Sequence, residues 1–214
     1  MTAGAVAVAL VGLLALAPAA GAAPAREQAL AALQGGDAEQ RRWAARVLGE
    51  VGAMEDAAPL ARALRDPDPL VRAFAEGAMW QVWSRSGDEE VDALFATGVE
   101  QMGQRKLQAA VATFTRVIER RPDFAEGWNK RATAYYLLGD YRRSLADCGE
   151  VVKRNPEHWG ALSGYGMIYL RLDQPGRALE FFERALAANP NLSQVRHTIE
   201  QLRALLLQRR RDSI

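Results

Sequence analysis

The sequence offers few residues for covalent, metal or cofactor chemistry. Cys148 is the only cysteine, which excludes an internal disulfide and a multi-cysteine zinc site. His158 and His197 are the only histidines, and apart from the weak pair of His197 with Glu200 neither has a metal ligand at helical spacing. Glycine-rich phosphate loops, nucleophile elbows and HExxH strings are also missing. We therefore expect no cofactor, no metal and no enzymatic activity.

An excess of charge of one sign is missing too. The chain has 27 lysines and arginines against 26 aspartates and glutamates, so its net charge of +1 creates no field that would attract nucleic acid. Basic residues such as Arg142 and Arg143 alternate with acidic ones such as Asp140 and Asp147. We expect no nucleic-acid partner. With 49% hydrophobic residues, the chain should fold into one or two domains.

Charged residues are absent from the first 23 positions. An apolar core over residues 6–17 is followed by a small-x-small site at residues 20–22, although no lysine or arginine precedes the core. The pattern predicts a signal peptide over residues 1–22, a mature chain from about Ala23, and a secreted or periplasmic protein without stable membrane insertion. The alternative is an uncleaved membrane anchor, which needs about 20 strongly apolar residues. Glycines, a proline and many alanines disfavour that alternative.

Two helical hairpins are predicted over residues 23–87. Asp37 caps a helix that Gly52 ends, and Asp68 caps a helix that ends at Gly87. The two hairpins overlay in register, which pairs Asp37 with Asp68, Arg41 with Arg72, Trp43 with Phe74, Ala44 with Ala75, Leu48 with Met79 and Val51 with Val82. The shared D-x-x-x-R-x-x-A string resembles the short HEAT repeats of the bilin-lyase type. Arg72 is expected to reach the carbonyls or the aspartate of an adjoining turn.

Three prolines, Pro122, Pro156 and Pro190, recur at a constant interval along the chain. A fixed period of this length indicates stacked repeats, because a single hairpin cannot bury its own apolar face. Equal units with this period cover 91–124, 125–158 and 159–192 within a predicted region 88–192.

Small residues stand at two positions of each unit, namely Gly98, Ala132 and Gly166 at position eight, and Ala110, Ser144 and Ala178 at position twenty. Position twenty-four holds Phe114, Cys148 and Phe182. With these small and bulky positions in the frame of the three prolines, the chain resembles the tetratricopeptide repeat (TPR) family. Positions eight and twenty are expected to face each other where the two helices of a hairpin cross.

Residues 193–214 are predicted to form a capping helix over the last repeat. The resemblance implies an all-α, right-handed α-solenoid, in which a HEAT-like pair is followed by three TPR units and this helix. Trp80 and Trp83 lie on one helical face, and we expect them to be buried against the first TPR helix at Leu94 and Phe95. That contact would make one continuous solenoid.

The resemblance also implies a binding surface. In TPR proteins the first helix of each hairpin lines a concave groove, and the corresponding residues here are Asp92, Phe95, Val99, Met102, Glu126, Asn129, Thr133, Tyr136, Gly160, Ser163, Met167 and Leu170. Such a surface suits a peptide or a helix of another protein. Asn129 is expected to bond a peptide backbone, and Tyr136 and Met167 to give contact area. The alternative is that several of these side chains pack beneath the capping helix or a neighbouring repeat.

The predicted function is that of an exported, non-enzymatic scaffold or adaptor in the cell envelope that binds another protein through its groove. A carboxylate clamp for chaperone tails is not expected, because Phe95 and Val99 stand where that clamp needs lysine and asparagine. One alternative is an accessory helical subunit of an envelope enzyme or assembly machine. A self-associating solenoid is another.

Overall fold

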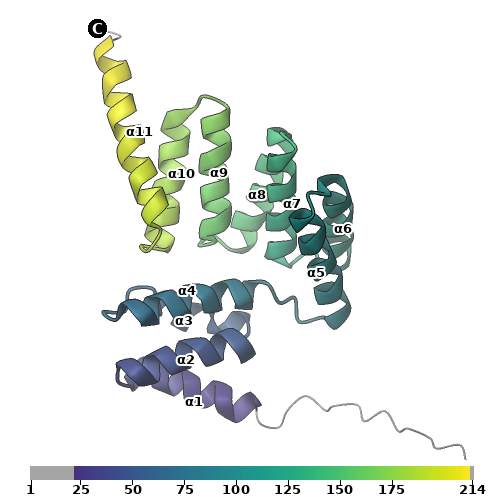
Figure 1. The fold of residues 1–214 in the computed structure, drawn as a ribbon, viewed down its shortest axis with the longest axis vertical. Helices are drawn as coiled ribbons and strands as arrows, with labels where there is room; N and C mark the ends of the chain where they lie inside the picture. The colour runs from purple at the N-terminus through teal and green to yellow at the C-terminus, as the bar shows by residue number, and fades with distance from the viewer. Residues whose placement is uncertain (1–21, 213–214) are drawn as a thin grey trace, which may run out of the picture.

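The computed structural model describes residues 22–212, which form eleven α-helices and one short 3-10 helix and, within that range, no strand (Figure 1). The predicted signal peptide, residues 1–22, lies outside the described residues except for Ala22, where the first helix begins. Within 22–212 no helix is both long and apolar enough to span a membrane.

Residues 22–83 form an N-terminal block of paired helices. Its elements are α1 (Ala22–Gly35), α2 (Ala38–Val51), η1 (Met54–Asp56), α3 (Ala57–Ala63) and α4 (Pro69–Trp83). The repeated hairpin pattern places Leu48 of α2 and Val82 of α4 in one core, where both side chains are fully buried together with Leu60 and Leu64. Burial of these apolar side chains is what holds the block together.

Polar side chains close the turns of the N-terminal block. Asp37 and Asp68 each accept hydrogen bonds from backbone N–H groups of the helix that follows, as expected for N-caps. Asp68 also pairs with Arg42, and the guanidinium holds the pKa of this carboxyl far below its usual range. Arg72 donates from Nη1 to the carbonyl of Asp66 at 2.8 Å, which confirms the predicted reach to an adjoining turn.

Residues 89–212 form a row of antiparallel hairpins, the repeat array. Its helices are α5 (Glu89–Gly103), α6 (Leu107–Arg120), α7 (Ala125–Leu137), α8 (Tyr141–Arg154), α9 (Trp159–Arg171), α10 (Pro175–Ala188) and α11 (Ser193–Asp212). Each predicted unit supplies one hairpin, and Figure 1 shows the helices standing side by side. Ile199 and Leu202 of α11 are buried against Ala178 and Phe182 of α10, so α11 covers the last hairpin.

The three hairpin turns of the array share one backbone conformation. Position fifteen of the units is occupied by Arg105, Gly139 and Asp173, and their φ angles are 58°, 78° and 50°. Only glycine adopts this left-handed conformation without steric cost. The first and third turns therefore keep the geometry of the glycine turn despite their different sequences.

Small residues at position eight make room for the residue at position twenty-four. A Cβ added at Gly98 would lie 2.6 Å from the Phe114 ring, and one at Gly166 would lie 2.6 Å from the Phe182 ring. In the second unit the Ser144 hydroxyl donates to the Ala132 carbonyl at 2.7 Å, so position twenty does face position eight there. In the first and third units the phenylalanine ring at position twenty-four lies at the same helix crossing.

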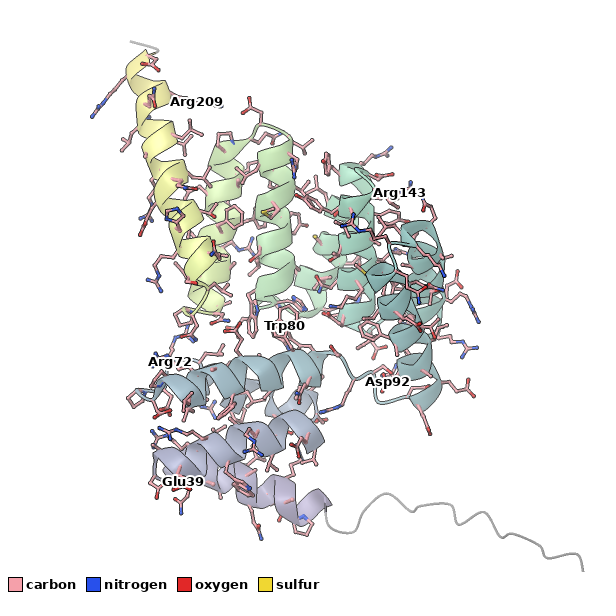
Figure 2. All side chains as sticks on the ribbon, viewed as in Figure 1. Glu39, Arg72, Trp80, Asp92, Arg143 and Arg209 are labelled. Carbon is pink, nitrogen blue, oxygen red and sulfur yellow. The ribbon has the colours of Figure 1, made fainter. Side chains whose placement is uncertain are left out.

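The prediction that Trp80 and Trp83 pack on Leu94 and Phe95 is wrong. Both indoles lie instead against the boundary of the second and third units, where Trp83 stacks on His158 with ring centroids 4.3 Å apart and Trp80 meets Trp159 at 5.5 Å. The chain leaves α4 through Gly87, whose φ is 77°, and Figure 2 shows Asp92 of α5 apart from Trp80. Phe95 packs on rings of its own unit.

Polar contacts from the first turn of α4 and from the loop before it extend this junction. Arg65 donates from Nη2 to the carbonyl of Ala187 at 2.5 Å, and Arg72 donates from Nε to Asn191 at 3.1 Å. Asn191 in turn donates to the carbonyl of Leu64 at 2.9 Å. The fold is the expected all-α solenoid, but the N-terminal block lies across the ends of the later hairpins instead of stacking on the first (Figure 1).

Candidate binding groove

The predicted groove residues differ widely in exposure. Val99, Thr133 and Met167 are exposed, Met102, Tyr136, Ser163 and Leu170 are half-buried, and Phe95, Glu126 and Asn129 are buried. The TPR resemblance assigned them to one face, but only some of these side chains are exposed.

The Asn129 side chain has a hydrogen-bond partner within the protein. It is buried, and its Nδ2 donates to Glu126 Oε2 at 3.0 Å. Leu170 packs with the cluster formed by α10 and α11, so for this residue the alternative of packing beneath the capping helix is correct. Both side chains thus make contacts within the chain, although Asn129 also borders an open hollow of the groove.

Glu126 is the centre of a buried polar network that the sequence did not reveal. His158 Nδ1 accepts from the backbone N–H of Ala161 at 3.2 Å, which leaves the ring hydrogen on Nε2 to donate to Glu126 Oε2 at 2.9 Å. The Lys130 ammonium lies 3.0 Å from the other carboxylate oxygen. Burial alone would raise the pKa of Glu126, but the His158 bond and the Lys130 charge outweigh it and lower this pKa.

The N-terminal block closes one end of the groove. A Cβ added at Gly160 would lie 2.6 Å from the Trp80 indole, and the Lys130 ammonium lies 5.8 Å from the centre of the same ring. Figure 2 shows Trp80 directed from α4 toward the repeat array. A partner therefore has access only to the part of the groove beyond Trp80.

A hollow of about 110 Å³ lies in that open part, between α7 and α9. We call it the groove hollow, and it is lined by Asn129, Ala132, Thr133, Tyr136, Ser144, Cys148, Gly160, Gly164, Met167 and Ile168. The Thr133 hydroxyl donates to the Asn129 carbonyl at 2.9 Å, so this polar atom is already paired within the chain. Burial raises the pKa of the Cys148 thiol to about 12, which keeps it neutral. The walls thus present mainly apolar atoms.

The rim of the groove hollow carries a positive charge. Tyr136 accepts a hydrogen bond from Arg171 Nε at 3.2 Å, and the Arg171 side chain is otherwise exposed. The phenol holds the guanidinium beside the opening.

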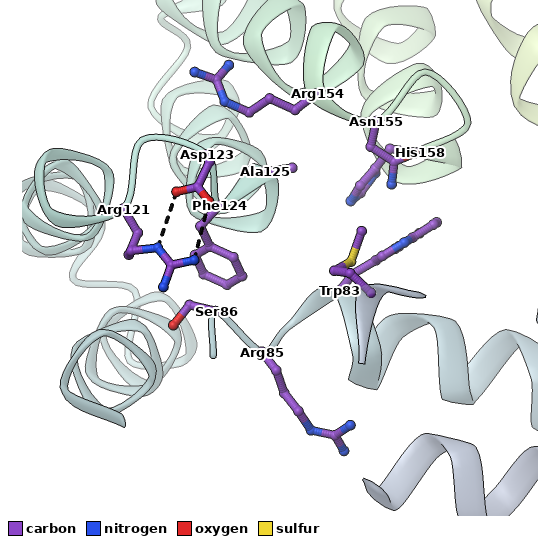
Figure 3. A pocket seen from close by; sticks show the side chains of 11 residues that line it. Trp83, Arg85, Ser86, Arg121, Asp123, Phe124, Ala125, Arg154, Asn155 and His158 are labelled. Atoms are coloured by element: carbon purple, nitrogen blue, oxygen red, sulfur yellow. Dashed lines mark hydrogen bonds and ion pairs between the residues drawn. The ribbon is translucent and has the colours of Figure 1, made fainter. Parts of the chain in front are cut away.

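A second hollow lies where the N-terminal block meets the repeat array (Figure 3). Its volume is also about 110 Å³, and its walls include Trp83, His158 and three arginines. Arg85 donates to the carbonyl of Gly52 at 2.8 Å, Arg154 to that of Pro122 at 2.6 Å, and Arg121 pairs with Asp123. The three guanidinium groups therefore already have partners within the chain. Residues 22–212 also contain no group of three histidine, cysteine, aspartate or glutamate side chains arranged to hold a metal.

Comparison with known sequences agrees with the repeat frame set by the three prolines. The tetratricopeptide repeat family model matches residues 95–148 and 130–193. The chain contains tetratricopeptide repeats. A TPR repeat-containing protein of Rhizobium etli is 32% identical over 126 residues, which cover 59% of this chain and 61% of that protein. The small glutamine-rich tetratricopeptide repeat-containing protein of Dictyostelium discoideum is 29% identical over 44% of this chain and 28% of its own length. The chain thus spans less than two thirds of these relatives.

Solved structures give the same fold for the TPR part. The first TPR domain of Spaghetti (RPAP3), bound to the HSP90 peptide SRMEEVD, matches with a TM-score of 0.53 and 23% identity over 56% of this chain and 94% of that one. The Sgt2 TPR domain of Aspergillus fumigatus matches with a TM-score of 0.55 and 20% identity over 58% and 83%. The HEAT-like character of the N-terminal block stays a prediction from its repeated hairpin pattern.

Proposed function

We propose that this chain is an exported, non-enzymatic scaffold that binds a segment of another protein in the open part of the TPR groove. The observation that supports this best is the groove hollow, because an apolar recess beside the exposed Met167 is what an interaction site for a peptide needs. The likeness to a TPR domain bound to an HSP90 peptide supports the same role for the groove.

An acidic C-terminal tail is not the partner that we propose. Phe95 is buried among aromatic rings and Val99 is exposed and apolar, so the first unit has no cation at the positions where a carboxylate clamp would need one. We expect an internal segment of the partner to bind instead.

Self-association is a second candidate. Leu205 and Leu207 of α11 are 38% and 58% exposed, beyond the contact of α11 with α10. Exposed apolar side chains on a terminal helix favour contact with another copy. A molar mass that rises with concentration in light scattering, and falls after Leu207→Ala, would favour this candidate.

Export is part of the proposal and rests on the uncharged, apolar residues 1–22. When the full chain is expressed in a bacterial host, we expect cleavage near Ala23 and recovery of the product outside the cytoplasm. Mass spectrometry of the intact product decides this, since an uncut chain in the membrane fraction would support the anchor instead.

Partner capture tests the groove. The chain from Ala23 is immobilised and exposed to an envelope extract of its source, in parallel with a variant carrying Tyr136→Ala and Met167→Ala. A matched control carries Met54→Ala and Leu70→Ala, which remove side chains that are 50% and 48% exposed on the N-terminal block. We expect a partner that the parent and the control retain and the groove variant loses. Equal capture by all three would contradict the proposal.

A further inference from the structure

The three TPR units differ at one place that bears on ligand binding. In the first and third units a phenylalanine at position twenty-four packs its ring on the glycine at position eight of the same hairpin. In the second unit Cys148 stands at position twenty-four and Ala132 at position eight. The groove hollow borders both of these small residues. The second unit therefore lacks a ring with which its neighbours fill their own hairpins.

The adjoining helix compensates only in part for the missing ring, because Ile168 of α9 packs with Ala132 and Cys148 but leaves the hollow open. Gly160 and Gly164 of α9 both line the hollow and have no side chain to place in it. At Gly164 the only atom near an added Cβ would be the Cys148 sulfur, at 3.4 Å, which is an ordinary contact distance. The space is open toward the groove because Thr133, Tyr136 and Met167 form its rim.

We propose that the groove hollow is a socket for one uncharged apolar side chain of the partner segment, which takes the place of the ring missing from the second unit. The proposal rests on the proposed function, because it names the part of the ligand that the same groove recognises.

Size and chemistry both select an apolar side chain. An engineered apolar cavity of about 150 Å³ binds benzene, so a hollow of 110 Å³ suits one aliphatic side chain or a ring that enters in part. Ser144 and Thr133 already use their hydroxyl hydrogens within the chain, donating to the carbonyls of Ala132 and Asn129. A charged side chain in the hollow would lose its hydration and find no ion-pair or hydrogen-bond partner in return.

The rim adds a preference for a neighbouring acidic group. Arg171 bonds to the Tyr136 hydroxyl, and in the described part of the chain no carboxylate is paired with it. A partner that places Asp or Glu close to its apolar side chain would therefore meet a complementary charge. The partner class is a peptide segment with an apolar anchor and an adjacent carboxylate.

Small model amides test the socket directly. The chain is labelled with ¹³C at its methionine methyl groups, and the resonance of Met167, on the rim, is followed by NMR during titration. N-acetyl-leucinamide is the probe and N-acetylglycinamide the control. We expect a saturable shift of the Met167 resonance with the leucine probe and at least tenfold weaker binding of the glycine control, because burying a leucine side chain is worth that much affinity.

Two variants close the socket from opposite sides. The double variant Ala132→Gly with Cys148→Phe copies the pair found in the first and third units, and Gly164→Leu fills the hollow from α9. Cys148→Ala is the matched control because it leaves the hollow open. Both closing variants should abolish the Met167 shift while the control keeps it. A leucine response that persists in a folded closing variant, or an equal response to glycine, would overturn the proposal.

Partner capture separates this inference from the proposed function. A partner that is lost with Tyr136→Ala and Met167→Ala, and also with the closed socket, supports both. If capture depends on Tyr136 and Met167 but not on the open socket, the groove binds its partner and the socket proposal fails.

Discussion

The N-terminal block and the repeat array are both built from helical hairpins, yet different interactions set their geometry. In the array, glycine at position eight lets a phenylalanine ring fill the crossing of two helices, so side-chain volume fixes the distance between them. In the block, two-pronged ion pairs join helix ends, namely Arg26 with Asp56, Arg41 with Asp66 and Arg42 with Asp68. Each region also has contacts of the other kind, such as Arg131 with Asp147 in the array and Gly49 close to Ala78 in the block. Because rings on glycines recur in the array and ion pairs recur in the block, we expect the array to respond mainly to changes of volume and the block mainly to changes of charge.

The pitch of the array explains this difference. A row of equal hairpins needs the same spacing at each step, and packing of small against large side chains repeats well. The block has unequal helices, since α3 spans 7 residues and α4 spans 15. Its turns therefore differ from one another. Arginines that reach from one turn to the next hold them in place.

The largest effect is expected at the contact between the two regions. Trp83 is 4% exposed and stacks on His158, so Trp83→Ala should cost about 3–5 kcal/mol, the usual range for loss of a buried tryptophan. It should also separate the unfolding of the block from that of the array, giving two calorimetric transitions where the parent has one. Trp43, 41% exposed on α2, is the control, and Trp43→Ala should leave the transition nearly unchanged. One unshifted transition in Trp83→Ala would contradict the observed docking.

A smaller effect is expected for volume within the array. Gly166→Ala puts a methyl group against the Phe182 ring and should cost about 1–3 kcal/mol. Gly77→Ala in the block meets no atom within 4 Å and should stabilise the protein by about 0.5–1 kcal/mol through helix propensity. Urea unfolding of both variants measures this difference. Combining Gly166→Ala with Phe182→Leu should recover part of the cost, and strict additivity of the two changes would contradict direct packing.

Two carboxylates of the block should contribute to the acid sensitivity of the protein. Bonds from Arg41 and Arg42 lower the pKa values of Asp66 and Asp68 below the ordinary 3.8, so both carboxylates stabilise the folded state above that pH. The contribution is lost as pH falls below about 4 toward the lowered folded values. Asp68→Asn keeps an N-cap residue but removes the charge. We expect urea midpoints of this variant to fall less than those of the parent between pH 5 and pH 3. An equal fall would mean that other carboxylates dominate.

The sequence predicts the fold of the array well because the constant repeat period fixes which positions face each other. Tyr136 and Met167 lie on the groove as this frame requires, since helical geometry alone decides their direction. The docking of the N-terminal block could not be predicted. It depends on Trp83 meeting His158, two residues that no repeat relates, and His158 in turn bonds to the buried Glu126, which accepts from Asn129. The groove hollow lies where Cys148 departs from the repeat pattern. This departure is visible in the sequence only when Cys148 is aligned with Phe114 and Phe182 at position twenty-four.

The smallest effect is expected at the hairpin turns of the array, where the units share one backbone conformation but differ in sequence. Arg105 holds a φ of 58° in the place that Gly139 takes in the second unit, and a side chain in this conformation costs about 1–2 kcal/mol. Arg105→Gly relieves the strain but makes the unfolded chain more flexible, so the net gain should be about 0.5–1 kcal/mol. The reverse change, Gly139→Ala, should destabilise by a similar amount, and Arg105→Ala should change little. Melting temperatures of the three variants distinguish backbone strain from loss of the Arg105 charge, because only strain predicts opposite signs for the two glycine exchanges.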